Sequence, residues 1–174
     1  MRRDPFLLTP GPLTTSRSTK EAMLHDWGSR DSEFVAMNAR VCERLLDLAG
    51  GRGSHVCVPL QGSGTFIVEA MIGTLVPADG KLLILANGAY GQRMARIAER
   101  YRRAVIVKES PEDVPVSVAA LDDALGGDPS ITHVAVVQCE TTSGILNPVD
   151  DVAQVTARRR RSWRRSAGAA GGAR

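Results

Sequence analysis

Two runs of apolar residues without polar alternation constrain the fold of this chain more than any other feature. They are KLLILA at residues 81–86 and THVAVVQCE at residues 132–140. Continuous apolar strands are buried on both faces, whereas strands of alternating polarity keep one face in water. Segments with helical periodicity separate the strand-like runs, an alternation typical of a parallel sheet. We therefore expect an α/β fold, with a mostly parallel sheet and helices on both faces.

Further segments extend this alternation. Gly50 and Gly51 are a typical helix stop, and Ser117 can cap the helix that follows it. The apolar periodicity predicts helices over residues 31–49, 65–75, 91–101 and 118–127, and strands over residues 55–60 and 104–109.

The composition is that of an ordinary globular protein. The chain has 174 residues, 43% of them hydrophobic and 24% charged, which fits one domain with a sizeable core. Neither a membrane span nor a signal peptide is evident, so we expect a cytoplasmic protein without a membrane partner. The three cysteines and three histidines lack the spacing of metal ligands, and we expect no metal site.

The basic residues are concentrated at one end of the chain. Residues 156–174 contain seven arginines and no acidic residue. The net charge of +3 is therefore +7 in this segment and −4 in residues 1–155. Because residues 1–155 are net negative, we do not expect them to attract the negative backbone of a nucleic acid.

Three loops follow predicted strands, where ligands of parallel sheets bind. In the first, QGSGT at residues 61–65, the glycines permit close approach to the backbone and the helix that follows favours an anion such as phosphate. Taken alone this signal is weak, because most short glycine turns bind nothing. Tyr90, in the loop NGAYGQR, can stack on a planar ligand or pack on its own helix. The third loop, CETTSGILNP, places a row of hydroxyl groups after a strand, as an ordinary capped turn or as ligand contacts. Together the loops suggest a phosphorylated planar ligand, such as pyridoxal 5′-phosphate.

Five motifs in order resemble one enzyme family. They are LTPGPLTTS, DWGSRD, QGSGTF, NGAYGQR and ETTSGILNP, spread over residues 8–148. They resemble the 2-aminoethylphosphonate:pyruvate aminotransferases, class V enzymes of the fold-type I group that depend on pyridoxal phosphate. The resemblance implies part of the large, cofactor-binding domain of that fold over residues 1–155. It also implies transamination of 2-aminoethylphosphonate with pyruvate, giving phosphonoacetaldehyde and alanine, by a homodimer.

The resemblance assigns roles to individual positions. Ser63, Gly64 and Thr65 match the cradle of the cofactor phosphate, and Tyr90 matches the aromatic residue that stacks on the pyridine ring. A hydroxyl that bonds the ring near its O3′ oxygen matches Thr141, with Thr142 as the alternative.

Two further positions match the substrate pocket. Gly11 lies in the loop that lines the pocket, and Arg30 is either an anion contact or an ion-pair partner of structural importance.

The family pattern is incomplete in this chain. Lys20, Lys81 and Lys108 are its only lysines, and none has the sequence context of the lysine that forms the Schiff base with the cofactor. We therefore assign no catalytic residue and expect the chain to be inactive by itself. A non-catalytic fragment that binds phosphate or pyridoxal phosphate is an alternative function.

Residues 156–174 depart from the family pattern. Their bias toward arginine, alanine and glycine suggests translation out of frame, and we expect this segment to be disordered. The rival interpretation is an arginine-rich arm that binds nucleic acid or an anionic membrane.

Overall fold

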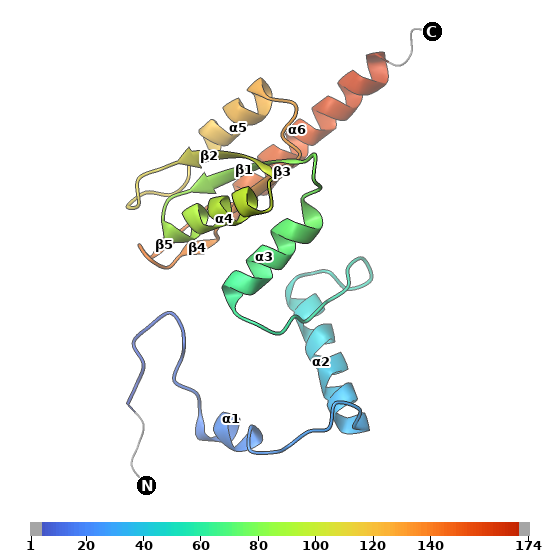
Figure 1. Ribbon diagram of the computed structural model, residues 1–174, viewed down its shortest axis with the longest axis vertical. Coiled ribbons are helices and arrows are strands. Elements are labelled where there is room, and N and C mark those ends of the chain that lie inside the picture. Colours follow the sequence, from blue (N-terminus) through green and yellow to red (C-terminus); the bar gives the residue numbers. More distant parts are fainter. Residues whose placement is uncertain (1–4, 171–174) are drawn as a thin grey trace. The chain divides into compact units, whose positions relative to one another are not determined.

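The computed structural model describes residues 5–170 (Figure 1). The chain forms two compact units that divide between Gln61 and Gly62. The first unit contains α1 (Arg17–Ala22) and α2 (Ser32–Leu48). The second contains every strand of the described chain and the helices α3 to α6. The expectation of one incomplete domain over residues 1–155 stays a prediction.

In the first unit, the long helix predicted over residues 31–49 is confirmed as α2, but the strand predicted over residues 55–60 is wrong. This segment has no regular secondary structure. The exposed fractions of Val56 and Val58 are 84% and 66%. Apolar, β-branched residues favour a strand only where a neighbouring strand accepts their backbone hydrogen bonds. The described residues of this unit offer no such neighbour.

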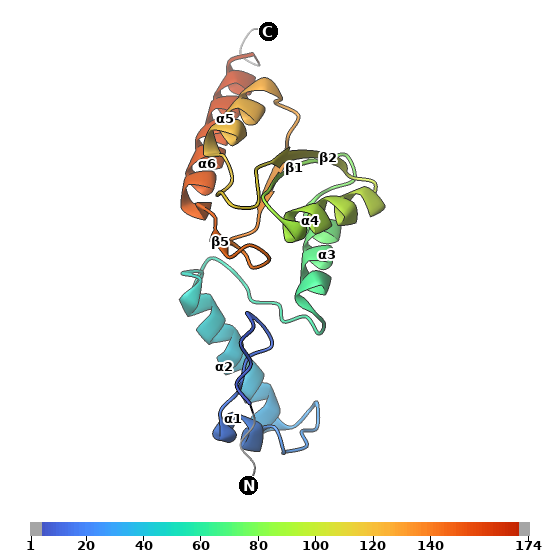
Figure 2. The ribbon, with the colours of Figure 1, turned by 90° about the vertical axis from the view of Figure 1, so that its left-hand side faces the viewer.

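The second unit is built on a parallel sheet with the strand order β2-β1-β3. The central strand β1 (Lys81–Ala86) pairs with β2 (Ala104–Glu109) on one side and β3 (His133–Val136) on the other. Five of its six residues are buried, which explains the uninterrupted apolar run in the sequence. Figure 2 shows the sheet from a second direction.

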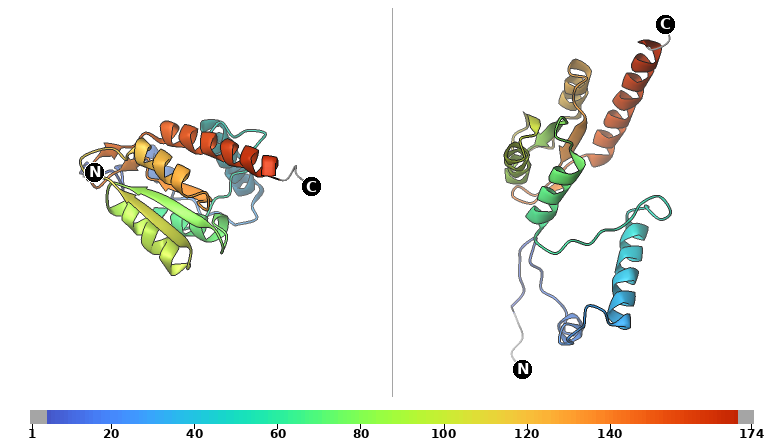
Figure 3. Two further views of the ribbon diagram at one scale, coloured as in Figure 1. Left: turned by 90° about the horizontal axis from the view of Figure 1, so that it is seen from above. Right: turned by 45° about the vertical axis from the view of Figure 1, so that its right-hand side comes forward.

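Helices cover both faces of this sheet (Figure 3). Leu82, Ile84 and Ala86 of β1 pack against α3 (Gly64–Leu75) and α4 (Ala89–Arg100). Leu83 and Leu85 point to the opposite face, where they pack against α5 (Val118–Gly127) and α6 (Val149–Ala170). The alternation follows from the period of two residues in a strand. The expected parallel α/β architecture is confirmed.

The predicted strand over residues 132–140 is broken in the structure. After β3 the chain leaves the sheet, and β4 (Cys139–Glu140) pairs antiparallel with β5 (Ile145–Leu146). Gly144, with φ of +79°, closes the hairpin and donates its N–H to the Glu140 carbonyl at 2.7 Å. A left-handed turn of this kind favours glycine, and it brings the third predicted loop back beside the sheet.

Helix α6 includes residues 156–170, part of the segment for which the sequence predicts disorder, and that disorder stays a prediction. Helix α6 continues to Ala170, and residues 171–174 lie outside the described part of the chain. Arginine and alanine are strong helix formers, and no proline interrupts them. Arg158 and Arg159 pair with Asp122 of α5, at 3.1 and 2.7 Å. Their proximity lowers the pKa of Asp122, with the Arg159 hydrogen bond as the main cause.

An ion pair joins the first residue of β1 to the turn before β3. Lys81 Nζ donates to Asp128 Oδ2, and the hydroxyl and N–H of Ser130 donate to Asp128 Oδ1. The Lys81 hydrogen bond, followed by those from Ser130, lowers the pKa of Asp128 to about 2. Because the folded state favours the ionised carboxyl, this contribution to stability is present above the ordinary pKa and is lost as pH falls toward 2.

We therefore expect Asp128→Asn to lower the free energy of unfolding at neutral pH. The difference from the unchanged protein should shrink as pH falls below about 4, where the unfolded carboxyl takes up its proton. Urea unfolding over a pH series measures this difference. Asp79→Asn, at an exposed turn, is the matched control. A deficit for Asp128→Asn that does not change with pH would contradict this account.

Candidate functional site

A cavity of about 520 Å³ lies in the second unit, between α3, α4 and the segment that follows β3. Its inner wall is apolar, formed by side chains of α3, α4 and β3. Its polar lining combines hydroxyl, thiol, phenol and guanidinium groups, from Ser63, Thr65, Tyr90, Arg93, Cys139 and Thr141. An apolar cavity with a few convergent polar groups is the usual form of a small-molecule site.

The first turn of α3 forms one side of this cavity. Ser63 caps the helix by accepting the Phe66 N–H at 3.2 Å. In the described part of the chain the N–H groups of Gly64 and Thr65 have no partner, as expected in the first turn of a helix. A Cβ atom on Gly64 would meet nothing within 4 Å, so this glycine leaves open space over the backbone. Free N–H groups beside open space form a place where an anion can bind.

Tyr90 stands at the N-terminus of α4, on another side of the cavity. Its side chain is 39% exposed and the Arg93 guanidinium lies 5.1 Å from the centre of its ring. The ring thus lines the cavity and also packs on Arg93 of its own helix, so both alternatives stay open.

The three hydroxyl residues after β3 have different surroundings. Thr141 lines the cavity. Thr142 donates its hydroxyl to Glu140 Oε1 at 2.7 Å, and Ser143 donates to the Glu140 carbonyl oxygen at 3.4 Å. Of the two threonines that the sequence left open, Thr141 lines the cavity, and its role toward a ligand stays a prediction.

Two buried asparagines join the loops at the carboxyl edge of the sheet. Asn87 and Asn147 exchange hydrogen bonds between their amide groups, at 3.0 Å in each direction. Asn87 also donates to the Val114 carbonyl, while Asn147 accepts the Val116 N–H and donates to the Val137 carbonyl. No buried side-chain nitrogen or oxygen in the described chain lacks a partner. The loops after all three parallel strands are therefore held together.

Glu140 is fully buried and joins two of the loops that line the cavity. Its Oε2 accepts the Tyr90 N–H at 3.2 Å, while Oε1 accepts the Thr142 hydroxyl. Gly88 is needed beside it, because a Cβ there would lie 2.5 Å from Glu140 Cγ. Sequence reasoning missed the importance of Glu140, as it did that of Arg93, Asn87 and Asn147. The available signal was position: Asn87 directly follows the buried strand β1, Arg93 lies in the NGAYGQR motif, and Glu140 and Asn147 lie in the CETTSGILNP motif.

The two predicted substrate-pocket residues belong to the first unit. Gly11 lies in an exposed segment with a cis peptide bond to Pro12, and Arg30 is exposed just before α2. The structure therefore brings Ser63, Gly64, Thr65, Tyr90 and Thr141 to one cavity of the second unit, whereas Gly11 and Arg30 belong to the first unit. The roles of these last two remain predictions.

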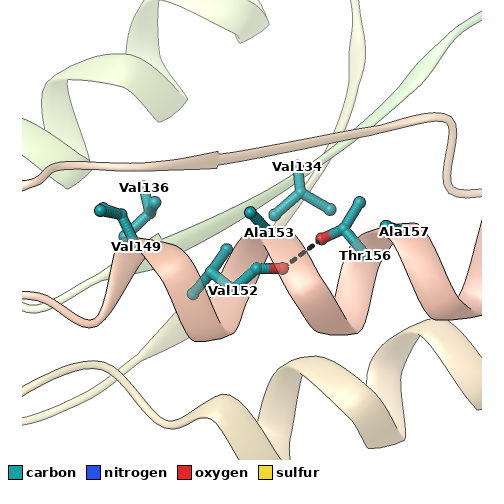
Figure 4. A pocket seen from close by; sticks show the side chains of 7 residues that line it. All are labelled: Val134, Val136, Val149, Val152, Ala153, Thr156 and Ala157. Carbon is teal, nitrogen blue, oxygen red and sulfur yellow. Dashed lines mark hydrogen bonds between the residues drawn. The ribbon is translucent and has the colours of Figure 1, made fainter. Parts of the chain in front are cut away.

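A second hollow differs from the cavity beside α3 in its chemical lining. It measures about 450 Å³ and lies between β3 and α6 (Figure 4). Valine and alanine side chains line it, together with Thr156, whose hydroxyl donates to the carbonyl of Val152 in its own helix. This hollow offers no group for an anion. Across the described residues, no three His, Cys, Asp or Glu side chains gather as a metal site, and no helix has the length and apolar character needed to cross a membrane.

We expect Glu140→Ala to destabilise the fold by about 1–3 kcal/mol, because the Tyr90 N–H and the Thr142 hydroxyl would lose their partner. Glu140→Gln should retain most of the stability, since an amide can accept from Tyr90 and donate to the Thr142 oxygen. Denaturant unfolding measures both variants. Glu99→Ala, an exposed position on α4, is the control. Equal stability of Glu140→Ala and Glu99→Ala would show that these bonds are dispensable.

Comparison with known proteins shows which enzymes the chain is similar to. The chain is 58% identical over 156 residues to a 2-aminoethylphosphonate–pyruvate transaminase from Pseudomonas aeruginosa, covering 90% of this chain and 42% of that relative. A protein of the same name from Pseudomonas putida is 58% identical over 158 residues, covering 91% and 43%. The chain thus spans about two fifths of the length of the curated relatives it matches. No protein-family model matches the sequence.

Solved structures agree on the fold. The pyridoxamine–pyruvate aminotransferase of Mesorhizobium loti superposes with a TM-score of 0.81 at 26% identity, over 89% of this chain and 39% of that one. An alanine–glyoxylate aminotransferase from Nostoc gives a TM-score of 0.77 at 24% identity, over 91% and 44%. The expected fold, part of the large domain of a fold-type I aminotransferase, is confirmed. The chain is therefore similar to part of the 2-aminoethylphosphonate–pyruvate transaminases, over about two fifths of their length.

Proposed function

We propose that this chain is the cofactor-binding part of a 2-aminoethylphosphonate–pyruvate transaminase, and that its cavity binds pyridoxal 5′-phosphate. The observation that carries the proposal is the open first turn of α3, with two free N–H groups and the Thr65 hydroxyl beside a cavity that also contains Tyr90. A phosphate suits the helix N-terminus, and a planar ring suits the phenol. The identity to the named transaminases supports this ligand over other phosphates.

The residues of the cavity would have separate roles toward this cofactor. Ser63, Gly64 and Thr65 would hold the phosphate, Tyr90 would stack on the ring, and Thr141 would bond a ring oxygen. The bound cofactor supplies the electron sink of transamination, while the protein supplies orientation and charge.

We further propose that the chain does not complete the reaction by itself. Lys81 begins β1 and is paired with Asp128, at the end of the strand opposite the cavity. Lys108 lies on the exposed part of β2 and does not line the cavity, and Lys20 belongs to the first unit. Activity with 2-aminoethylphosphonate and pyruvate, a homodimeric assembly and a cytoplasmic location are likewise proposals that rest on the family.

The arginine-rich arm is a weaker second candidate. Arg158 and Arg159 are already paired with Asp122, so they are not fully available to phosphates of a nucleic acid. Binding to nucleic acid by the remaining arginines would weaken steeply as salt concentration rises. An out-of-frame origin of residues 156–174 stays a proposal, which reading the gene in its other frames would test.

Binding is best tested with pyridoxamine 5′-phosphate, which lacks an aldehyde and so does not react with surface lysines. We expect the unchanged chain to bind it more tightly than pyridoxamine, by about tenfold or more, in calorimetric titration. Gly64→Ala should remove much of this preference by filling the space over the first turn of α3. Gly127→Ala is the control, because a Cβ there also meets nothing and both positions are helical. No preference for the phosphorylated compound would contradict the proposal.

The absence of a catalytic lysine has its own test. We expect pyridoxal 5′-phosphate followed by borohydride reduction to give no single stoichiometric lysine adduct, as located by mass spectrometry. Scattered low-level labelling of Lys20, Lys81 and Lys108 is the expected result. One complete adduct at any of them would show that the chain carries a catalytic lysine.

A further inference from the structure

Arg93 connects the two parts of the cavity that the proposed cofactor needs. It lies three residues after Tyr90 on α4, a spacing that puts both side chains on one face of a helix. Its Nη1 donates to Thr65 Oγ1 of α3 at 3.0 Å, and its guanidinium carbon lies 5.1 Å from the centre of the Tyr90 ring. One side chain thus touches both the predicted phosphate cradle and the predicted ring-stacking residue.

The hydrogen bond to Thr65 determines what its hydroxyl can do. A guanidinium has only donors, so the Thr65 oxygen is the acceptor in this pair. The single hydrogen of the hydroxyl then remains available for another partner. Because Thr65 lies in the first turn of α3 and lines the cavity, an anion bound there is a suitable partner. Arg93 therefore prepares Thr65 to act as a donor.

The contact with Tyr90 has a matching effect on the ring. A guanidinium at this distance is attracted to one face of the phenol. That face is then occupied, and a planar ligand would stack on the other. The same contact limits rotation of the Tyr90 side chain, so that less conformational freedom is lost when a ligand binds.

The charge of Arg93 also points to an anion. The N-terminus of a helix carries a partial positive charge, so a cation beside the first turn of α3 is unfavourable unless a negative group accompanies it. Glu69 lies in the adjoining groove with Arg93, but its carboxylate accepts a hydrogen bond from the Tyr101 hydroxyl at 3.2 Å. A bound phosphate would supply a negative charge within the cavity itself.

We propose that Arg93 is a positioning residue for the cofactor, which orients the Thr65 hydroxyl toward the phosphate and fixes the Tyr90 ring for stacking. This inference rests on the proposed function of the cavity. It goes beyond that proposal because Arg93 is neither one of the residues proposed to hold the phosphate nor the residue proposed to stack on the ring.

The test compares Arg93→Met and Arg93→Lys with Arg96→Met. Arg96 is an exposed arginine of the same helix that lines the adjoining groove but not the cavity, so it controls for lost charge. Calorimetry gives the affinities for pyridoxamine 5′-phosphate and pyridoxamine, and urea unfolding verifies that each variant is folded. Arg93→Met should reduce the preference for the phosphorylated compound by about tenfold, while Arg96→Met should change it less than twofold. Arg93→Lys retains the charge without the planar fork and should lie between them.

A double-mutant cycle separates positioning from a general loss of charge. If Arg93 acts through Thr65, the combined variant Arg93→Met/Thr65→Val should lose less affinity than the two single losses predict together. Additive losses, or equal behaviour of Arg93→Met and Arg96→Met, would overturn the inference while leaving the proposed function intact. An unchanged chain that binds both compounds equally would instead overturn the proposed function, and the inference with it.

Discussion

The reciprocal pair between Asn87 and Asn147 is the constraint on which the rest of the candidate site depends. Both side chains are almost fully buried, and each needs amide or carbonyl partners because an unpaired polar group in a core is costly. The partners come from the loops after three strands, so the pair can be satisfied only when those loops have one arrangement. Burial of this pair therefore favours one arrangement of the three loops, at the edge of the sheet where the cavity lies.

Much of the fold could be predicted from the sequence, because its parallel sheet leaves a strong apolar signal. Residues 81–86 are apolar since β1 is central and both of its faces are covered. The same signal failed at residues 55–60, where composition favours a strand but no partner strand is described. It also overran the end of β3, because Cys139 and Glu140 continue an apolar-rich run while the chain is already in a hairpin. Strand propensity records a preference of side chains, whereas a strand exists only with its neighbour.

In the candidate site too, some residues leave a signal in the local sequence and others do not. Residues that would contact a ligand, such as Ser63, Gly64 and Tyr90, lie at the N-termini of helices, where glycine and hydroxyl residues leave a local signal. Residues that hold these turns in place, such as Glu140 and Asn147, act over 50 or 60 positions along the chain. No local pattern contains that information, because the partners meet only after the sheet has formed.

This division links binding at the cavity to stability of the fold. Strand β3, which contributes to the cavity wall, pairs with β1 through four register positions and has no other neighbouring strand among the described residues. Edge strands of this kind open more readily than central ones, because fewer interactions hold them. A ligand that bridges α3, α4 and the loop after β3 would bind only when all three are in place. Its binding free energy would then oppose local opening at β3, so the part of the sheet with the least internal support is also the part that a bound cofactor would stabilise most.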